Sequence, residues 1–183
     1  SHSYIWRKVY PSLLERGFQV QLFDLLGFGR SERPVDPLVE TSVAAQAQLL
    51  PKLLDSWGTD RAHLVAHDIG GAVAMRSTLA HPARVRSLTL VDAVRYDSWP
   101  SPTWRKIIDR GLEELITAGD DAHRAMLARQ LRMTVYDKSI MEGEILDKYL
   151  QPISGPLGQP SFFQHQVRHY DSKYTEEIEG ELG

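Results

Sequence analysis

Two short apolar runs with a helix-like segment between them constrain the fold more than any other feature of this chain. The runs are HLVAH at 63–67 and RSLTLVDAV at 86–94, and the segment between them is GGAVAMRSTLAHP at 70–82. Runs that are apolar throughout are typical of strands buried on both faces of a parallel sheet. Strand, helix and strand in this order predict a right-handed crossover, so we expect an α/β protein with a parallel sheet.

The residues before these strands predict further elements of the same layered fold. Apolar residues recur at helical spacing over 5–14 and predict one helix with a buried stripe, which Gly17 ends. The alternating segment FQVQLFDLL at 18–26 predicts a strand, and a loop rich in Gly and Pro follows it. Residues 43–58 predict another helix, with a kink at Pro51.

The pattern changes after residue 95, where helical periodicity replaces strands. The predicted elements are helices over 104–116, 121–133 and 142–150, a loop over 151–160, and a helix over 161–183. An α/β half followed by a helical half predicts a sheet core over 1–95 and an inserted helical cap over 96–183.

Composition excludes several classes of function. The 183 residues carry a formal net charge of −3, which gives no basic surface for nucleic acid. The chain contains no cysteine, so disulfides and thiolate metal sites are excluded and a cytoplasmic location is allowed. No apolar run reaches the roughly 20 residues that span a bilayer. We expect a small-molecule substrate, no metal or cofactor, and neither nucleic acid nor membrane as a partner; composition leaves the oligomeric state open.

One aspartate stands where the first of the two apolar runs meets the following helix. The residues Ala66-His67-Asp68-Ile69-Gly70 fit the pattern small-x-nucleophile-x-Gly of a nucleophile elbow, a strained turn that exposes its central side chain. The helix N-terminus that follows favours a negative charge on Asp68. The alternative is that Asp68 caps this helix, which is a common role for aspartate at such a position.

Four segments together resemble the α/β-hydrolase superfamily. They are SHSYIWRKVYPSL, FDLLGFGRSERP, VAHDIGGAVA and HPARVRSLTLVDAV. The resemblance covers residues 1 to about 100 and is to the branch with an aspartate nucleophile: haloalkane dehalogenases, haloacetate dehalogenases and epoxide hydrolases. It implies the α/β-hydrolase fold, a parallel sheet core with an inserted helical cap.

The resemblance also implies a mechanism. The Asp68 carboxylate would attack a carbon that bears a halide or an epoxide oxygen, and water would cleave the resulting alkyl-enzyme ester. The backbone N–H of Ile69 would stabilise the oxyanion, together with a His-Gly-x-Pro loop that would precede residue 1. The family usually has Trp after the nucleophile as a halide donor, and Ile69 argues against haloalkane dehalogenation.

Aromatic residues of the cap are candidates for contacts with substrate. Tyr136, Tyr149 and Tyr170 resemble the cap tyrosines that protonate the opening epoxide, and Trp99 and Trp104 are candidates to line the pocket or to donate an indole N–H. Ordinary aromatic packing is the alternative for each of them.

Two further aspartates require an assignment. Asp92, at the end of the run 86–94, falls where some haloalkane dehalogenases carry the acid that orients the catalytic histidine, and a hydrogen-bonded turn residue is the alternative. A carboxylate that ends a buried strand is costly unless it is paired. Asp24, within FDLLGFGRSERP, is interpreted as a structural turn residue.

None of the seven histidines matches the catalytic histidine of the family. His67 is expected to point away from the pocket, and His123, His165 and His169 are interpreted as solvated cap residues. We therefore expect this chain to be an internal piece of a longer hydrolase, incomplete at both ends of the fold and inactive by itself. The alternatives are a binding protein without turnover and an esterase or lactonase, although such esterases need Ser at the elbow.

Overall fold

The computed structural model describes residues 2–36 and 38–182. The chain forms two compact units, one of residues 1–37 and 111–166 and the other of residues 38–110 and 167–183. These units are defined by how densely their residues contact one another. The expected core over 1–95 and cap over 96–183 are parts of the family's fold, and that division stays a prediction.

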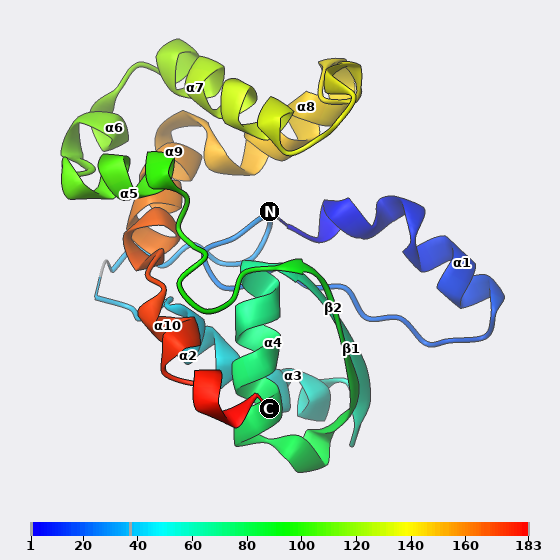
Figure 1. Ribbon diagram of the computed structural model, residues 1–183. Coiled ribbons are helices and arrows are strands. Elements are labelled where there is room, and N and C mark those ends of the chain that lie inside the picture. Colours follow the sequence, from blue (N-terminus) through cyan, green and yellow to red (C-terminus); the bar gives the residue numbers. More distant parts are fainter. Residues whose placement is uncertain (1, 37, 183) are drawn as a thin grey trace. The chain divides into compact units, whose positions relative to one another are not determined.

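The second unit contains the predicted strand, helix and strand. These are β1 (Ala62–Asp68), α4 (Ile69–Ala80) and β2 (Val85–Ala93). The strands β1 and β2 pair in parallel. Figure 1 shows α4 running alongside the two strands. The parallel sheet and its connecting helix are thereby confirmed.

The strands are more exposed than their apolar sequences predicted. Val65 is 47% exposed, Leu90 41% and Val91 44%, so the expectation of strands buried on both faces is wrong here. The buried residues of α4 include Gly71, Ala72, Val73, Ala74, Met75 and Ser77. This helix covers one face of the pair, and the described residues leave much of the strands' remaining surface in contact with solvent.

The predicted helix over 43–58 is two helices. They are α2 (Val43–Ala47) and α3 (Leu50–Ser56), and Pro51 lies in the first turn of α3. Proline lacks an N–H and is tolerated where that N–H would have no helical partner, so the chain restarts a helix there instead of kinking one. The Ser77 hydroxyl of α4 donates to the Ala47 carbonyl of α2 at 2.8 Å, which ties the two helices together in the core.

The first residues of the chain differ from the prediction. The helix over 5–14 is a 3-10 helix η1 (Ser3–Lys8) followed by α1 (Tyr10–Glu15), and neither contains a buried residue. The predicted buried stripe is therefore wrong, because its side chains are only partly covered. Gly17, with φ 81°, follows α1 as expected of a residue that ends a helix.

The segment 18–26 is extended but forms no strand, which corrects the prediction of one. A strand is defined by hydrogen bonds to a neighbouring strand, and in the described part of the chain β1 and β2 pair only with each other. Alternation of apolar residues predicts which face a strand buries but does not supply the partner.

The helical region agrees with the sequence in its middle and differs at its ends. Helices α7 (Asp120–Met133) and α8 (Gly143–Leu150) are confirmed. The helix predicted over 104–116 is divided into α5 (Pro102–Asp109) and α6 (Glu113–Thr117), with Gly111 between them at φ 91°. A left-handed residue such as this cannot continue a helix.

The predicted loop over 151–160 is wrong. It contains a 3-10 turn, η4 (Gln151–Ile153), and residues 155–160 of the helix α9 (Gly155–His165). This helix has Pro156 in its first turn and Pro160 inside it. The remaining residues form no continuous helix. They contain the short pieces η5 (Val167–His169), α10 (Lys173–Glu176) and η6 (Glu179–Glu181). Two further 3-10 turns are η2 (Pro82–Arg84) and η3 (Lys138–Ile140).

Two histidines that were interpreted as solvated are buried in the first unit. His123 is 2% exposed and its Nε2 lies 2.6 Å from the Ile153 carbonyl oxygen. His165 is 1% exposed and its Nε2 lies 2.8 Å from the Pro34 carbonyl oxygen. The interpretation failed because one nitrogen of each ring, Nε2, lies within hydrogen-bond distance of a carbonyl oxygen far away in the sequence, which reduces the cost of burying a polar ring.

Candidate active site at the strand-to-helix junction

Asp68 has the backbone that a nucleophile elbow requires. It is the last residue of β1, with φ 55° and ψ −131°. A non-glycine residue in this region costs on the order of 1–3 kcal/mol and persists only where the surrounding structure enforces it. Asp68 occupies the N-cap position of α4, but its side chain makes no capping hydrogen bond, so the alternative that its carboxylate caps the helix is not supported.

Close packing of α4 against β2 explains the glycines behind Asp68. A Cβ added to Gly71 would lie 2.3 Å from the Cβ of Ala93, whereas one added to Gly70 would meet no atom within 4 Å. The helix can therefore approach the strand only because residue 71 has no side chain. The elbow pattern singles out Gly70, but in this part of the chain Gly71 carries the steric constraint.

Ile69 begins α4, directly after Asp68. The first N–H groups of a helix have no helical acceptor and lie at the positive end of its dipole. The Ile69 N–H is therefore one of the N–H groups at the start of α4 that lack a helical acceptor, and its role as an oxyanion donor stays a prediction.

Tyr170 is the candidate tyrosine whose phenol interacts electrostatically with Asp68. Burial raises the pKa of the Tyr170 phenol above its ordinary value, and the negative charge of Asp68 raises it further. A tyrosine is protonated at neutral pH even at its ordinary pKa of about 10, so the Tyr170 hydroxyl can donate a hydrogen bond. Both residues belong to the second unit.

Two tryptophans surround the Tyr170 ring. Its centroid lies 6.4 Å from that of Trp99 at an interplanar angle of 60°, and 5.9 Å from that of Trp104 at 87°. Edge-to-face pairs of this kind are favourable aromatic contacts. The Trp99 indole Nε1 donates to the Thr175 hydroxyl at 2.8 Å, so this N–H is committed to a protein partner in the structure.

The other two tyrosines lie elsewhere. Tyr149 belongs to the first unit, where Arg7 donates to its hydroxyl at 3.2 Å and the Tyr4 ring packs edge-on at 5.4 Å. Tyr136 is fully exposed. Of the three candidate tyrosines, the structure brings only Tyr170 into the unit that contains Asp68.

Asp92 occupies an irregularity of the sheet. The register passes from His67 opposite Val91 to Asp68 opposite Ala93, which leaves Asp92 as an extra residue, with φ 44°. It is exposed, so the premise that a buried carboxylate must be paired does not apply to it. Bulges of this kind often reorient side chains beside functional sites.

Asp24 is a turn residue, as the sequence indicated. Its carboxylate accepts hydrogen bonds from the Ser3 N–H at 2.5 Å and the Arg30 N–H at 2.8 Å. Burial raises the pKa of this carboxyl, but the two backbone donors outweigh that effect and the pKa lies below its ordinary value. Gly29 leaves the room that the carboxylate fills, because a Cβ there would lie 2.2 Å from Asp24 Oδ2.

No histidine hydrogen-bonds to Asp68 among residues 2–36 and 38–182. His67 Nδ1 is buried without a hydrogen-bond partner there, and His63 Nδ1 lies 2.7 Å from the Ser87 hydroxyl oxygen. His169 forms an ion pair with Glu40 at 3.6 Å. The same described ranges contain no cluster of three or more side chains suited to a metal ion, and none of their helices has both the length and the apolar character needed to cross a bilayer.

No sequence pattern indicates the residues that organise the surroundings of Tyr170. The contacts that join Thr175 to Trp99 and Arg76 to Tyr174 and Glu177 span between 76 and 101 positions in the sequence. A threonine within KYTEE and an arginine on a helix have no pattern that distinguishes them from surface residues.

A sequence model of the alpha/beta hydrolase fold matches residues 1–115. The chain therefore belongs to the alpha/beta hydrolase fold family. Its strand-turn-helix at Asp68 and its parallel strands are the corresponding structural features.

Individual relatives differ in the activities that their names state. The chain is 30% identical to a 2-hydroxymuconate semialdehyde hydrolase of Pseudomonas sp. (strain CF600), over 86% of this chain and 51% of that protein. It is 37% identical to a fluoroacetate dehalogenase of Burkholderia sp., over 50% of this chain and 30% of that protein. Three further relatives have the words carbamate hydrolase in their names.

A solved structure agrees over nearly the whole chain. An alpha/beta hydrolase fold protein from Burkholderia ambifaria superposes with a TM-score of 0.87 at 29% identity, covering 98% of this chain and 63% of that one. The chain spans about half or less of the length of the curated relatives named above.

Proposed function

We propose that the protein is a hydrolase with an aspartate nucleophile that acts on a small apolar electrophile: an alkyl halide, a haloacid or an epoxide. The observation that carries this proposal is the geometry of Asp68, a strained residue at the head of α4 whose carboxylate accepts no hydrogen bond from the described residues. The strained backbone at Asp68 brings its side chain no hydrogen bond, and a functional role would explain why the strain is kept.

The reaction has two steps. A carboxylate oxygen of Asp68 attacks the electrophilic carbon from the side opposite the leaving group, so a C–O bond forms as the bond to halide or epoxide oxygen breaks. Water then adds to the carbonyl carbon of the alkyl-enzyme ester, and the Ile69 N–H stabilises the resulting oxyanion. One proton of the attacking water passes to the catalytic histidine expected in the complete protein. Collapse of the intermediate breaks the bond between the carbonyl carbon and the alkyl oxygen, the leaving alkoxide takes the second proton to become the alcohol, and the Asp68 carboxylate is restored.

Tyr170 supports the epoxide arm of this proposal. An epoxide opens to an alkoxide, which needs a proton, whereas halide leaves as a stable anion. The Tyr170 phenol interacts electrostatically with Asp68 and, like any tyrosine at neutral pH, carries a proton, so it can donate a hydrogen bond to the opening oxygen. The fluoroacetate dehalogenase among the relatives supports the haloacid arm.

Asp92 is proposed as the acid that orients the catalytic histidine of the complete protein. Its position beside Asp68 on the adjacent strand supports this role. Asp92→Asn should lower the rate of ester hydrolysis more than the rate of ester formation, since the histidine acts on water. Equal loss in both steps would contradict the assignment.

Acyl transfer is the second candidate function. The semialdehyde hydrolase and carbamate hydrolase names among the relatives favour it. The aspartate at the elbow opposes it, because a carboxylate attacking an acyl group would form an anhydride rather than a stable ester. Products from phenyl acetate but none from epoxide or haloacid would favour this candidate.

The covalent intermediate provides the test. The full-length protein is mixed with styrene oxide or bromoacetate, quenched in acid within its first turnover and digested for mass spectrometry. An adduct of the substrate mass on the Asp68 peptide is expected. Turnover with an unmodified Asp68 peptide at every quench time would contradict the proposal, and Asp109→Asn, at an exposed position, is the matched control for nonspecific esterification.

A further inference from the structure

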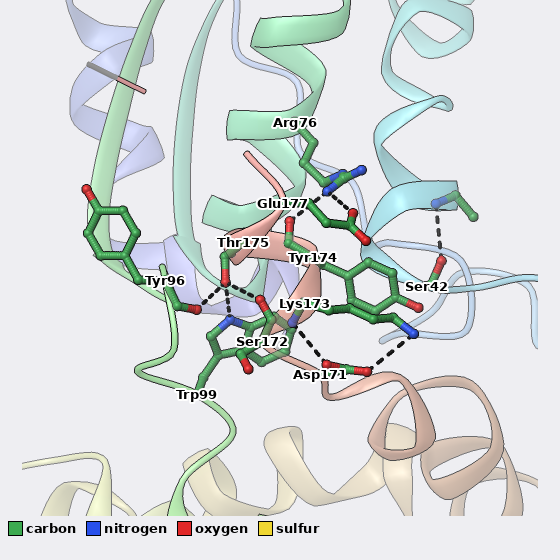
Figure 2. A network of polar contacts seen from close by, with 11 residues as sticks. Ser42, Arg76, Tyr96, Trp99, Asp171, Ser172, Lys173, Tyr174, Thr175 and Glu177 are labelled. Carbon is green, nitrogen blue, oxygen red and sulfur yellow. Dashed lines mark hydrogen bonds and ion pairs between the residues drawn. The ribbon is translucent and has the colours of Figure 1, made fainter. Parts of the chain in front are cut away.

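The Thr175 hydroxyl joins three parts of the second unit. It lies in α10 with no exposed surface. It accepts a hydrogen bond from the Trp99 indole Nε1 at 2.8 Å, and the carbonyl oxygens of Tyr96 and Ser172 lie within 2.5 and 2.9 Å of it (Figure 2). A hydroxyl has one proton to donate and can accept at the same time. Both of its roles are therefore filled, by the buried Trp99 indole and by two partly buried backbone carbonyls.

This hydroxyl determines how the Trp99 indole is turned. Trp99 is 4% exposed, and a buried indole N–H needs an acceptor. With its N–H directed at Thr175, the indole presents its ring to Tyr170 at 6.4 Å between centroids. The orientation of the Tyr170 ring is thus linked to Thr175 through Trp99.

A second set of contacts connects α10 and the residue after it to α4. Arg76 Nη1 of α4 donates to the Tyr174 carbonyl at 2.8 Å and to Glu177 Oε2 at 2.9 Å (Figure 2). α4 is the helix that begins directly after Asp68. The element that carries Thr175 is therefore attached to the same helix that follows the proposed nucleophile.

We propose that Thr175 is a positioning residue that, through the Trp99 indole, holds the Tyr170 phenol beside Asp68. The inference rests on the proposed function, in which Asp68 attacks the substrate and Tyr170 donates to the leaving oxygen. Thr175 itself contacts no reacting atom. Its effect is on the epoxide reaction, where the Tyr170 proton is needed.

Two substitutions separate the hydroxyl from the shape of the side chain. Thr175→Val keeps the branched shape but leaves the Trp99 N–H and the carbonyls of Tyr96 and Ser172 without this partner. Thr175→Ser keeps the hydroxyl. Thr134→Val is the matched control, because Thr134 also donates its hydroxyl to a carbonyl three residues earlier, at 2.7 Å, but at an exposed helix end.

The first readout is the structure of the cluster in solution. In spectra of the full-length protein, Thr175→Val should move the Trp99 indole ¹H–¹⁵N resonance upfield and should shift the ¹H–¹³C resonances of the Tyr170 ring. Thr175→Ser and Thr134→Val should leave both near their wild-type positions. Unchanged Trp99 and Tyr170 resonances in Thr175→Val would overturn the inference.

The second readout is a double-mutant cycle with styrene oxide as the probe. Thr175→Val should lower kcat about tenfold or more in the wild-type background, because small displacements of a positioned group are costly. It should lower kcat less than about twofold in Tyr170→Phe, where the phenol is already absent. Equal losses in the two backgrounds would show that Thr175 does not act through Tyr170.

A folding defect in Thr175→Val does not prevent the test. Trp99→Phe removes the N–H from the other side of the same hydrogen bond and should give the same loss of kcat and the same coupling to Tyr170→Phe. Independent, additive losses in Trp99→Phe and Tyr170→Phe would overturn the inference.

The quench experiment separates the failure of this inference from that of the proposed function. An adduct on Asp68 together with a rate that Thr175→Val leaves unchanged refutes the positioning role and leaves the nucleophile in place. Shifted Trp99 and Tyr170 resonances without any Asp68 adduct refute the nucleophile, while the link from Thr175 to Tyr170 stands.

Discussion

Two aspartates at the ends of extended segments, Asp24 and Asp68, have opposite surroundings in this protein. Both oxygens of Asp24 accept backbone N–H groups. At that turn Gly27 and Gly29 adopt the left-handed backbone conformation, with φ of 80° and 50°. Asp68 adopts the unfavourable backbone itself, with φ 55°, and its side chain caps nothing.

The comparison shows what separates a structural carboxylate from one available for chemistry. Asp24 stabilises its turn because its charge is satisfied, and glycines take the strained positions without a steric penalty. At Asp68 the strain falls on the residue whose side chain is left free. Close packing behind Asp68 offsets this backbone strain, because Gly71 lets α4 lie close to Ala93.

The largest expected effect is that of Asp68→Asn. The amide is a very poor nucleophile, so kcat for styrene oxide and bromoacetate should fall by at least about a thousandfold. Asn tolerates positive φ, and the melting temperature should change little. Steady-state kinetics and thermal unfolding of the full-length variant measure the two effects, with Asp109→Asn as control. Activity of Asp68→Asn within tenfold of wild type would contradict the claim that Asp68, unlike Asp24, is a carboxylate used in the reaction.

Tyr170→Phe should have the next largest effect. Loss of the phenolic proton should lower kcat for styrene oxide by about ten- to a hundredfold and should leave the rate with bromoacetate nearly unchanged. Parallel kinetics on the two substrates measure this difference, with Tyr174→Phe as the neighbouring control. A similar loss on both substrates would indicate that Tyr170 shapes the pocket rather than donating a proton.

The sequence predicted the features that depend on neighbouring residues and missed those that depend on a partner far away in the sequence. The elbow at Asp68, the strands around it and the turn at Asp24 follow from small residues and apolar runs within about ten positions. The strand expected over 18–26, the loop expected over 151–160 and the solvated histidines were wrong, because each depends on a partner that is distant in the sequence. The role of Thr175 could not be predicted for the same reason.

Gly71→Ala tests the packing that supports the strained residue. A Cβ would overlap that of Ala93, so unfolding free energy should fall by about 1–3 kcal/mol. Gly70→Ala meets open space and should be neutral or stabilising by up to about 1 kcal/mol, since Ala is the better helix former. Urea unfolding of both variants measures this, and equal effects would show that Gly71 is not the close-approach residue.

The smallest effect is expected from Asp24→Asn, and it should depend on pH. The folded pKa of Asp24 lies below its ordinary value, so its charge stabilises the fold above about pH 4 and that contribution is lost as the pH falls through the lowered pKa. At pH 7 the variant should be less stable by about 1–2 kcal/mol, and this difference should shrink towards pH 2. Urea unfolding across the range measures it; a difference independent of pH would mean that the charge of Asp24 contributes nothing.

The most direct test of the central claim is oxygen labelling of Asp68. The full-length protein turns over substrate in H₂¹⁸O, and the peptide that contains Asp68 is analysed by mass spectrometry. Water attacks the ester at the carbonyl carbon of Asp68, so repeated turnover should place ¹⁸O in this carboxylate and in no other. Product formation with an unlabelled Asp68 would contradict the account, because it would require water to attack the substrate directly.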